Sequence, residues 1–199
     1  MIDTVVFDLG GVLVDFHPIE GIRSLGFSEE AVEVFREKIF ASVWEECDRY
    51  PYTDEEIRAR FKAEVPGFEK EVDLLCEHFP VLTGEYEYSR SWILSLKEAG
   101  KKVYILSNYG RRSFEENSKT YSFMGDVDGK VISYELQMVK PEPGIYQELA
   151  VKYGFSPENA VFIDDRQVNI DGAIAQGYQG IWFESYDTAR RKLEELLNR

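Results

Sequence analysis

Cysteine is scarce in this chain, with only Cys47 and Cys76 among 199 residues. No histidine or further cysteine lies near them at the spacing of a metal site. A chain of this length buries a sufficient core without disulfide or metal staples. We therefore expect both thiols to be reduced, as in a cytoplasmic protein.

Positive charge and long apolar runs are also lacking. Lysine and arginine total 23 against 37 acidic residues, which gives a net charge of -14. Such a surface repels phosphate backbones, so we expect no nucleic-acid partner. No apolar run approaches the ~18 residues of a membrane span, and no basic segment precedes the first apolar run. The glycine-rich fingerprints of nucleotide sites are absent as well. These absences favour a monomer or weak homodimer that acts on a small molecule in the cytoplasm.

Short β-branched and aromatic runs alternate with helix-like stretches along most of the chain. Three of the helix-like stretches end at or near Gly100, Gly154 and Gly177. This alternation predicts an α/β fold of the Rossmann-like, doubly wound type, with helices on both faces of a parallel sheet. The expected strands are 4–7, 102–106, 160–163 and 180–183, with a further short strand at 131–134, and the expected helices are 86–99, 144–153 and 170–176.

Residues 16–83 break this rhythm, because they contain amphipathic stretches and no convincing strand. Ser28 is expected to begin one helix, and Thr53 with Glu56 forms a capping-box pattern that begins another. We predict a helical cap at 16–83, inserted into a core made of 1–15 and 84–199. Open α/β sheets bind ligands at the carboxyl ends of their strands. An insertion after the first strand would therefore cover the site.

Four polar segments follow strand ends or lie in a loop near them. They are Asp8, Ser107-Asn108, Lys140 and Asp164-Asp165. Each alone is an ordinary turn, helix-start or surface-loop residue. In a parallel sheet, however, all four would converge on one edge, and their combination suits phosphoryl transfer.

The expected chemistry follows from these residue types. Clustered carboxylates require a cation, and an oxygen-rich site that binds phosphate suits Mg²⁺. The ion would neutralise phosphate charge so that an anionic Asp8 can attack phosphorus. Lys140 would hold the carboxylate and the phosphoryl group together, and Ser107 would bind phosphoryl oxygens with nearby backbone N–H groups.

The four segments resemble the four motifs of the haloacid dehalogenase (HAD) superfamily of hydrolases. The matching strings are 7–13 (FDLGGVL), 106–108 (LSN), 140–146 (KPEPGIY) and 162–165 (FIDD). The insertion between the first two motifs resembles a C1-type helical cap. The last two strings are similar to those of sugar-phosphate phosphatases, including the α-glucose-1-phosphate phosphatase type.

The resemblance implies a role for each matching residue. Asp8 would be the nucleophile and a metal ligand, and Asp165 the second carboxylate ligand. Asp164 would be a ligand or lie next to one, and Asn169 occupies the place of a supporting acid in many members. The backbone carbonyl of Gly10 would complete the protein ligands. Ser107 and Asn108 would bind phosphate, and Lys140 would be the anchoring amine.

The sequence departs from most phosphatases of the superfamily at Gly10, where they carry an aspartate that protonates the leaving group. Such general acid–base help is worth about 10²–10⁴-fold in rate. A good leaving group would tolerate its loss, or another group would replace it. The substitutes considered are Asp15, His17, Glu20 and Glu45.

Two alternatives to a phosphatase stay open. Dehalogenases of the superfamily also lack that acid and need no magnesium, but they usually lack the acidic pair as well. The pair Asp164-Asp165 favours the phosphatase, because adjacent carboxylates without a cation are costly. The other alternative is a non-catalytic binding protein that lost its activity with the acid at position 10. The intact Asp8, Ser107 and Lys140 argue against it.

Overall fold

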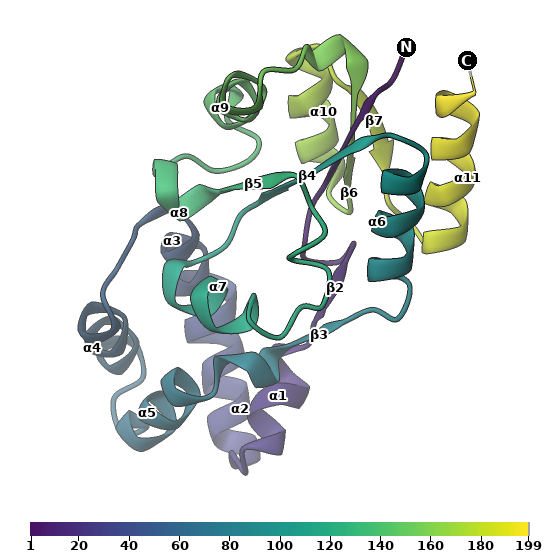
Figure 1. Ribbon diagram of the computed structural model, residues 1–199. Helices are drawn as coiled ribbons and strands as arrows, with labels where there is room; N and C mark the ends of the chain where they lie inside the picture. The colour runs from purple at the N-terminus through teal and green to yellow at the C-terminus, as the bar shows by residue number, and fades with distance from the viewer. Residues whose placement is uncertain (199) are drawn as a thin grey trace.

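The computed structural model describes residues 1–198, so the final position of the expected core range, Arg199, lies outside the described residues. Within that part of the chain, five parallel strands form one sheet in the order β5-β4-β1-β6-β7. The prediction of a parallel α/β sheet is confirmed (Figure 1). The strand bounds are β1 Thr4–Phe7, β4 Lys102–Ser107, β5 Gly129–Ile132, β6 Ala160–Asp164 and β7 Gln179–Trp182.

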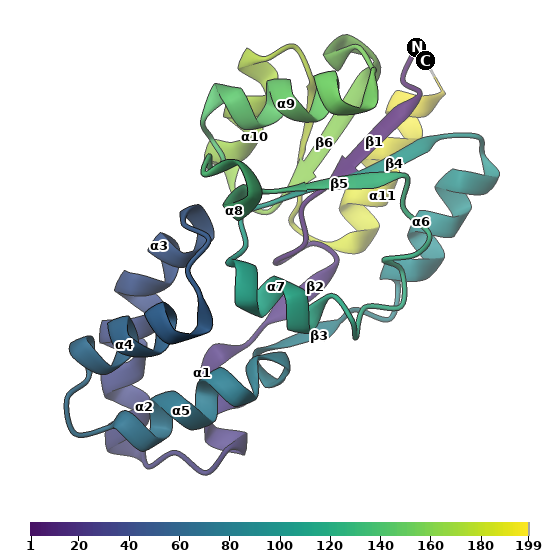
Figure 2. The ribbon, with the colours of Figure 1, turned by 60° about the vertical axis from the view of Figure 1, so that its left-hand side comes forward.

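Helices cover both faces of this sheet because alternate strand residues point to opposite sides. Val5 and Phe7 pack into one core cluster with residues of α6 and α11, whereas Val6 packs into another with residues of α9 and α10. Figures 1 and 2 show these two helix pairs on opposite sides of the strands. The helix bounds are α6 Ser89–Glu98, α7 Arg111–Asn117, α8 Ser133–Leu136, α9 Pro143–Tyr153, α10 Gln167–Ala175 and α11 Tyr186–Leu197.

The predicted helix ends at three glycines are confirmed. Gly100, Gly154 and Gly177 all have positive φ, of 75°, 69° and 92°. The expected strand at 131–134 is wrong in its second half, because β5 ends at Ile132 and α8 begins at Ser133. The hydroxyl of Ser133 bonds backbone groups of two other segments there, which the sequence run alone does not reveal.

The insertion after β1 is helical and has its own apolar core, centred on residues such as Phe35, Phe61 and Leu75. The predicted helix starts are confirmed: the Ser28 side chain caps α2, and Thr53 with Glu56 forms a capping box at α4. The helical bounds are α1 Pro18–Ser24, α2 Glu29–Phe35, a π-helical segment Arg36–Val43, α3 Trp44–Arg49, α4 Asp54–Glu64, α5 Glu69–Glu77 and a 3-10 turn Phe79–Leu82.

Two short strands that the sequence did not predict lie where the chain enters and leaves the insertion. β2 (Val14–Phe16) pairs antiparallel with β3 (Thr83–Glu85). Figure 2 shows this ribbon between the sheet and the helices of the insertion. On this basis we keep as a proposal that 16–83 is a cap on a core of 1–15 and 84–199. Among the described helices, none is both long and apolar enough to cross a bilayer.

Candidate active site

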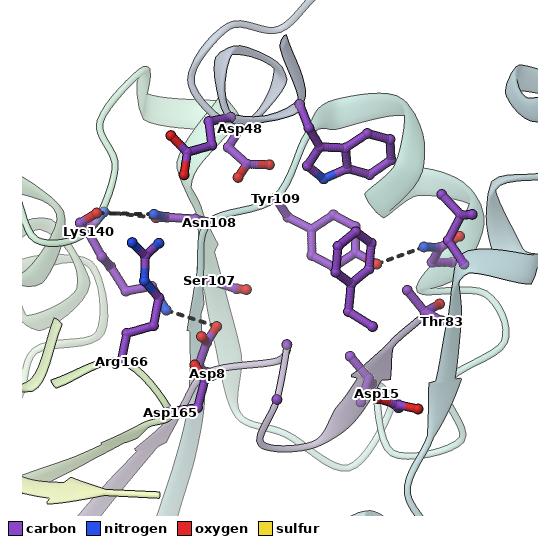
Figure 3. Close-up of a pocket in the computed structure, with 18 of the residues that line it drawn as sticks. Asp8, Asp15, Asp48, Thr83, Ser107, Asn108, Tyr109, Lys140, Asp165 and Arg166 are labelled. Carbon is purple, nitrogen blue, oxygen red and sulfur yellow. Dashed lines mark hydrogen bonds and ion pairs between the residues drawn. The ribbon is translucent and has the colours of Figure 1, made fainter. Parts of the chain in front are cut away.

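Three neighbouring strands deliver the polar segments to one edge of the sheet. Asp8 directly follows β1, Ser107 is the last residue of β4, and Asp164 is the last residue of β6. Since β4 and β6 flank β1, these three side chains reach the same place. Lys140 joins them from the loop between α8 and α9. The structure therefore brings the four segments together, as Figure 3 shows for Asp8, Ser107, Lys140 and Asp165.

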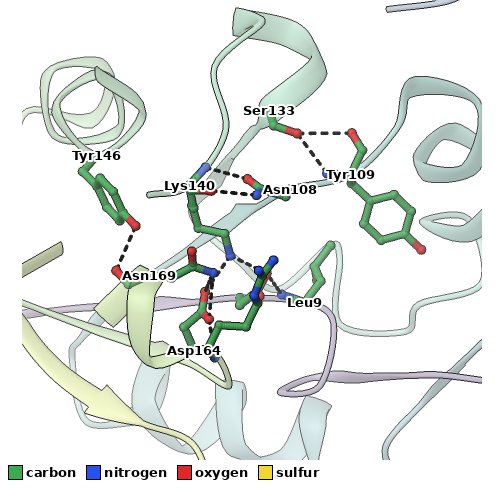
Figure 4. Close-up of polar contacts among 10 residues, drawn as sticks. Leu9, Asn108, Tyr109, Ser133, Lys140, Tyr146, Asp164 and Asn169 are labelled. Atoms are coloured by element: carbon green, nitrogen blue, oxygen red, sulfur yellow. Dashed lines mark hydrogen bonds and ion pairs between the residues drawn. The ribbon is translucent and has the colours of Figure 1, made fainter. Parts of the chain in front are cut away.

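The ammonium of Lys140 lies between two carboxylates. Its Nζ is 2.8 Å from Asp8 Oδ1 and 2.7 Å from Asp164 Oδ2, and all three side chains are buried. The backbone of Lys140 is held by Asn108, whose Nδ2 donates to the Lys140 carbonyl at 3.1 Å and whose Oδ1 accepts its N–H at 2.8 Å (Figure 4). The Asn108 side chain thus positions Lys140.

Asp164 already has a full set of donors. Besides Lys140, its oxygens accept hydrogen bonds from the Asn169 amide at 3.0 and 3.1 Å and from the Arg166 N–H at 2.8 Å. The carbonyl of Asn169 in turn accepts from the hydroxyl of Tyr146 at 2.8 Å (Figure 4). Asp164 therefore acts as the buried partner of Lys140.

Asp165 is placed differently, because it is exposed and lies against the turn after β1. Gly11 has a φ of 71°, and a Cβ at this glycine would overlap the Asp165 carboxylate. Only a glycine allows this approach. The turn and the second acidic side chain are thereby packed together beside Asp8.

Burial and mutual repulsion set the protonation of the cluster. Burial raises the pKa of Asp8 to about 7, and Asp164 adds to the rise while Lys140 opposes it. Burial also lowers the pKa of Lys140, but the carboxylates of Asp164 and Asp8 outweigh it, so the pKa of Lys140 is raised. Partial desolvation by the neighbouring turn and the Asp164 carboxylate likewise raise the pKa of Asp165, although its side chain is exposed. One lysine thus does not fully neutralise the three acids.

The three carboxylates could hold a cation. Asp8, Asp164 and Asp165 each offer an oxygen within 4.8 Å of the others. Such an all-oxygen donor set suits a hard divalent ion such as Mg²⁺. Because the donors around Asp164 occupy its oxygens, Asp8 and Asp165 are the better placed ligands.

A cavity of about 420 Å³ opens above these residues. Its floor is the sheet edge with Asp8, and its roof comes from the insertion (Figure 3). Gly10 lines the cavity, and a Cβ built there would meet nothing within 4 Å. The apolar part of the lining is Val14, Phe16, Phe40, Trp44 and Leu82. The volume suits a small ligand.

The match to a protein-family model decides the class of this protein. The model for the haloacid dehalogenase-like hydrolases covers residues 2–177. The chain belongs to this family of hydrolases. The resemblance seen in the four motifs is thereby confirmed at the level of the family.

Relatives of this HAD hydrolase include enzymes of two reaction types. It is 26% identical to D-ribitol-5-phosphate phosphatase of Bacteroides thetaiotaomicron, an alignment that covers all of both chains. It is 22% identical to haloacetate dehalogenase H-2 of Moraxella sp. (strain B), over 94% of this chain and 88% of the relative. A HAD family enzyme of B. thetaiotaomicron solved with magnesium and inorganic phosphate shares its fold, with a TM-score of 0.74 and 24% identity over 94% and 98% of the two chains.

The structure separates the residues considered as substitutes for the acid missing at position 10. Asp15 and Glu45 line the cavity of this hydrolase, whereas His17 and Glu20 are not among the described residues that line it. Asp15 is already engaged, because one of its oxygens lies 3.1 Å from His17 Nδ1 and the other accepts from the Tyr86 hydroxyl at 3.4 Å.

Sequence reasoning missed Asp48, which also lines the cavity of this hydrolase. The available signal was its spacing from Trp44, because residues four apart share one face of a helix. Both lie in α3 and both face the cavity. Without the course of the insertion, however, Asp48 looks like any acidic residue in an acidic stretch.

Proposed function

We propose that this chain is a Mg²⁺-dependent phosphatase that hydrolyses a small phosphorylated metabolite, such as a sugar phosphate, through an aspartyl-phosphate on Asp8. The observation that carries the proposal is the position of Asp8. Its carboxylate lies against the buried Lys140 ammonium and within 4.8 Å of Asp165. A nucleophilic carboxylate between a fixed cation and a metal-ligand set is suited to attack an anionic phosphorus centre.

Each side chain has a role in this reaction. Asp8 supplies the attacking oxygen, and Lys140 neutralises charge on Asp8 and on the transferred phosphoryl group. Ser107, at the end of β4, faces the same space (Figure 3). Its hydroxyl would donate a hydrogen bond to a phosphoryl oxygen. Asn108 acts mainly by fixing Lys140. Asp164 keeps Lys140 charged and oriented.

Asp8, Asp165 and the Gly10 carbonyl would hold the magnesium ion, with Asp164 behind them. When bound, Mg²⁺ screens the negative charge of the phosphate from the nucleophile. Asn169 and the Arg166 N–H would keep Asp164 in place beside this set.

The comparisons support a phosphatase without naming its substrate. The phosphatase relative aligns along its full length with this chain. A structural neighbour binds magnesium and inorganic phosphate. The cavity above Asp8 has room for a metabolite the size of a sugar phosphate.

The hypothesis of a dehalogenase is supported by the similarity to haloacetate dehalogenase and by the glycine at position 10. We place it second because Asp8, Asp164 and Asp165 form a carboxylate cluster that one lysine does not neutralise. A reaction that needs no metal gives no reason for the third carboxylate.

A substrate panel with and without Mg²⁺ tests the proposal. Pentitol, hexose and anomeric sugar phosphates are expected to release inorganic phosphate only with the metal, and Asp8→Asn is expected to abolish release. Release of chloride from chloroacetate in EDTA, with no phosphate released from any substrate, would instead establish the dehalogenase. If neither product forms, the binding-protein alternative is favoured.

A further inference from the structure

When the leaving group is an alkoxide, as in a sugar phosphate ester, the proposed reaction requires a proton donor on the far side of phosphorus from Asp8. In phosphoryl transfer the attacking and leaving oxygens are roughly in line with phosphorus. Gly10 has no side chain to protonate the leaving oxygen, and the space beside it is open. The donor must therefore come from the roof of the cavity, which the insertion supplies. This inference rests on the proposed phosphatase function.

Asp48 occupies that position. It lies near the end of α3 and lines the cavity together with Asp8. Figure 3 shows Asp48 at the opposite side of the cavity from Asp8, with Ser107 and Asn108 between them. A phosphoryl group bound at Ser107 and Lys140 would therefore present its leaving oxygen towards Asp48.

Asp48 and the residues before and after it in the sequence all contact residues outside the insertion. The Asp48 carbonyl accepts a hydrogen bond of 2.5 Å from the hydroxyl of Ser133, which itself accepts from the Tyr109 N–H at 2.9 Å. The preceding residue, Cys47, packs closely on Gly110. A Cβ added at Gly110 would lie 3.1 Å from the carbonyl oxygen of Cys47.

After Asp48, the next residue is anchored as well. Arg49 donates to the Gln137 carbonyl at 3.1 Å and forms a two-pronged ion pair with Glu142 at 2.5 and 3.3 Å. Three consecutive residues of the insertion thus contact the loop after β4, the start of α8 and the loop between α8 and α9. Such anchoring gives the backbone of Asp48 a defined position over the site.

The surroundings of Asp48 keep a proton available near neutral pH. Burial raises its pKa to about 7, and the carboxylates of Glu45 and Asp8 contribute to the rise. The Lys140 ammonium and the Gly110 backbone oppose it. Glu46, Arg49 and Arg166 line a second pocket that also includes Asp48. A general acid works best when its pKa lies near the working pH.

We propose that Asp48 is the general acid and base of this enzyme and replaces the acid missing at position 10. In the first step the Asp8–phosphorus bond forms and the bond to the leaving oxygen breaks, while the Asp48 proton passes to that oxygen. In the second step a water oxygen attacks phosphorus, and the Asp48 carboxylate takes a proton from that water. The Asp8–phosphorus bond then breaks, inorganic phosphate leaves, and Asp48 is again protonated.

The other two acids at the cavity are less suited. Asp15 is held by His17 and Tyr86, and Figure 3 shows its carboxylate pointing away from Asp8. Glu45 is exposed, whereas Asp48 is partly buried.

The test compares two leaving groups in the full-length Mg²⁺-loaded enzyme. Asp48→Asn is expected to lower kcat by ~10²–10⁴-fold for a sugar phosphate identified by the panel, whose alkoxide leaving group needs a proton. With 4-nitrophenyl phosphate, whose leaving group needs none, the loss is expected to be less than about tenfold. Glu45→Gln, from the same helix and cavity, is the matched comparison and should show no dependence on the leaving group.

A second variant tests the assignment independently. Gly10→Asp places a carboxylate in open space next to Asp8. Combined with Asp48→Asn, it is expected to restore part of the turnover of the sugar phosphate. An equal loss for both substrates in Asp48→Asn, or no loss, would overturn the role of Asp48 while the phosphatase function stands. If the wild-type enzyme releases no phosphate from either substrate, both proposals fail.

Discussion

The Nζ of Lys140 lies 2.8 Å from Oδ1 of Asp8, in a place where neither side chain is exposed to solvent. This pair links the loop before α9 to the end of β1, with Asp164 as the second partner of the lysine. A buried ammonium with two carboxylates is stable only as a complete set. The proposed catalysis and the folding of the chain therefore depend on the same contacts.

Replacing Lys140 with methionine tests that dependence. Lys140→Met leaves two buried carboxylates without their cation, so we expect loss of activity and a destabilisation of about 3–5 kcal/mol at pH 8. Urea unfolding without metal measures the destabilisation. It should shrink at pH 5, where Asp8, whose pKa burial raises to about 7, takes up a proton. Lys152→Met, at an exposed position of α9, should stay within about 0.5 kcal/mol of wild type. Wild-type stability of Lys140→Met at pH 8 would contradict the argument.

Asp164 and Asp165 should respond differently to the loss of their charge. Asp165→Asn is expected to raise the Mg²⁺ concentration for half-maximal activity at least ~10–100-fold, the range seen when a group that merely supports a ligand is lost. Because Asp165 is exposed, stability should change little. Asp164→Asn should destabilise the fold, since Asp164 is the buried partner of Lys140. Mg²⁺ titration and urea unfolding separate the two, with exposed Asp171→Asn as control.

The turn after β1 should not tolerate a side chain at Gly11. Gly11→Ala is strained by its φ of 71° and also overlaps Asp165. Gly26→Ala is the matched control, because its φ is 85° but a Cβ there meets nothing within 4 Å. Gly26→Ala should cost ~1–2 kcal/mol, the price of the left-handed backbone alone. Gly11→Ala should cost more in thermal unfolding and also weaken Mg²⁺ activation. Equal effects of both variants would show that the contact with Asp165 is unimportant.

Asp48 should make the metal-free protein less stable as pH rises. Its pKa is raised from 3.8 to about 7 in the folded state, so between these values the folded protein binds more protons than the unfolded chain. The contribution of Asp48 to the free energy of unfolding therefore falls as pH rises through this window and is constant above it. Asp48→Asn should show a shallower decline between pH 4.5 and 7 in urea unfolding, each unit of pKa difference being worth about 1.4 kcal/mol. Parallel curves for the two proteins would refute the shift.

The sequence was sufficient to predict the sheet, its flanking helices and the meeting of the four motifs. Val5, Val6 and Phe7 are apolar on both faces, which identifies a strand covered on both sides. Parallel pairing then places the carboxyl ends together whatever the details of the loops. These features depend on local composition and on general rules of topology.

The strand pair β2 and β3 and the role of Asp48 depend on long-range contacts and were not predictable in this way. Each strand has three residues, and they pair across the whole insertion. Likewise, only the folded chain brings Asp48 to Ser133, a residue 85 positions away. Ser133 itself looked like part of a strand, because its hydrogen bonds to Asp48 and Tyr109 leave no trace in the local pattern.

The open space beside Gly10 has a genetic consequence. A glycine codon ending in T or C becomes an aspartate codon through a single base change, and packing would not oppose the product. With such a codon at position 10, the aspartate common to most phosphatases of this superfamily is one base change away. Lack of room for a Cβ therefore does not explain the glycine at this position, and the missing acid is a matter of chemistry rather than of packing.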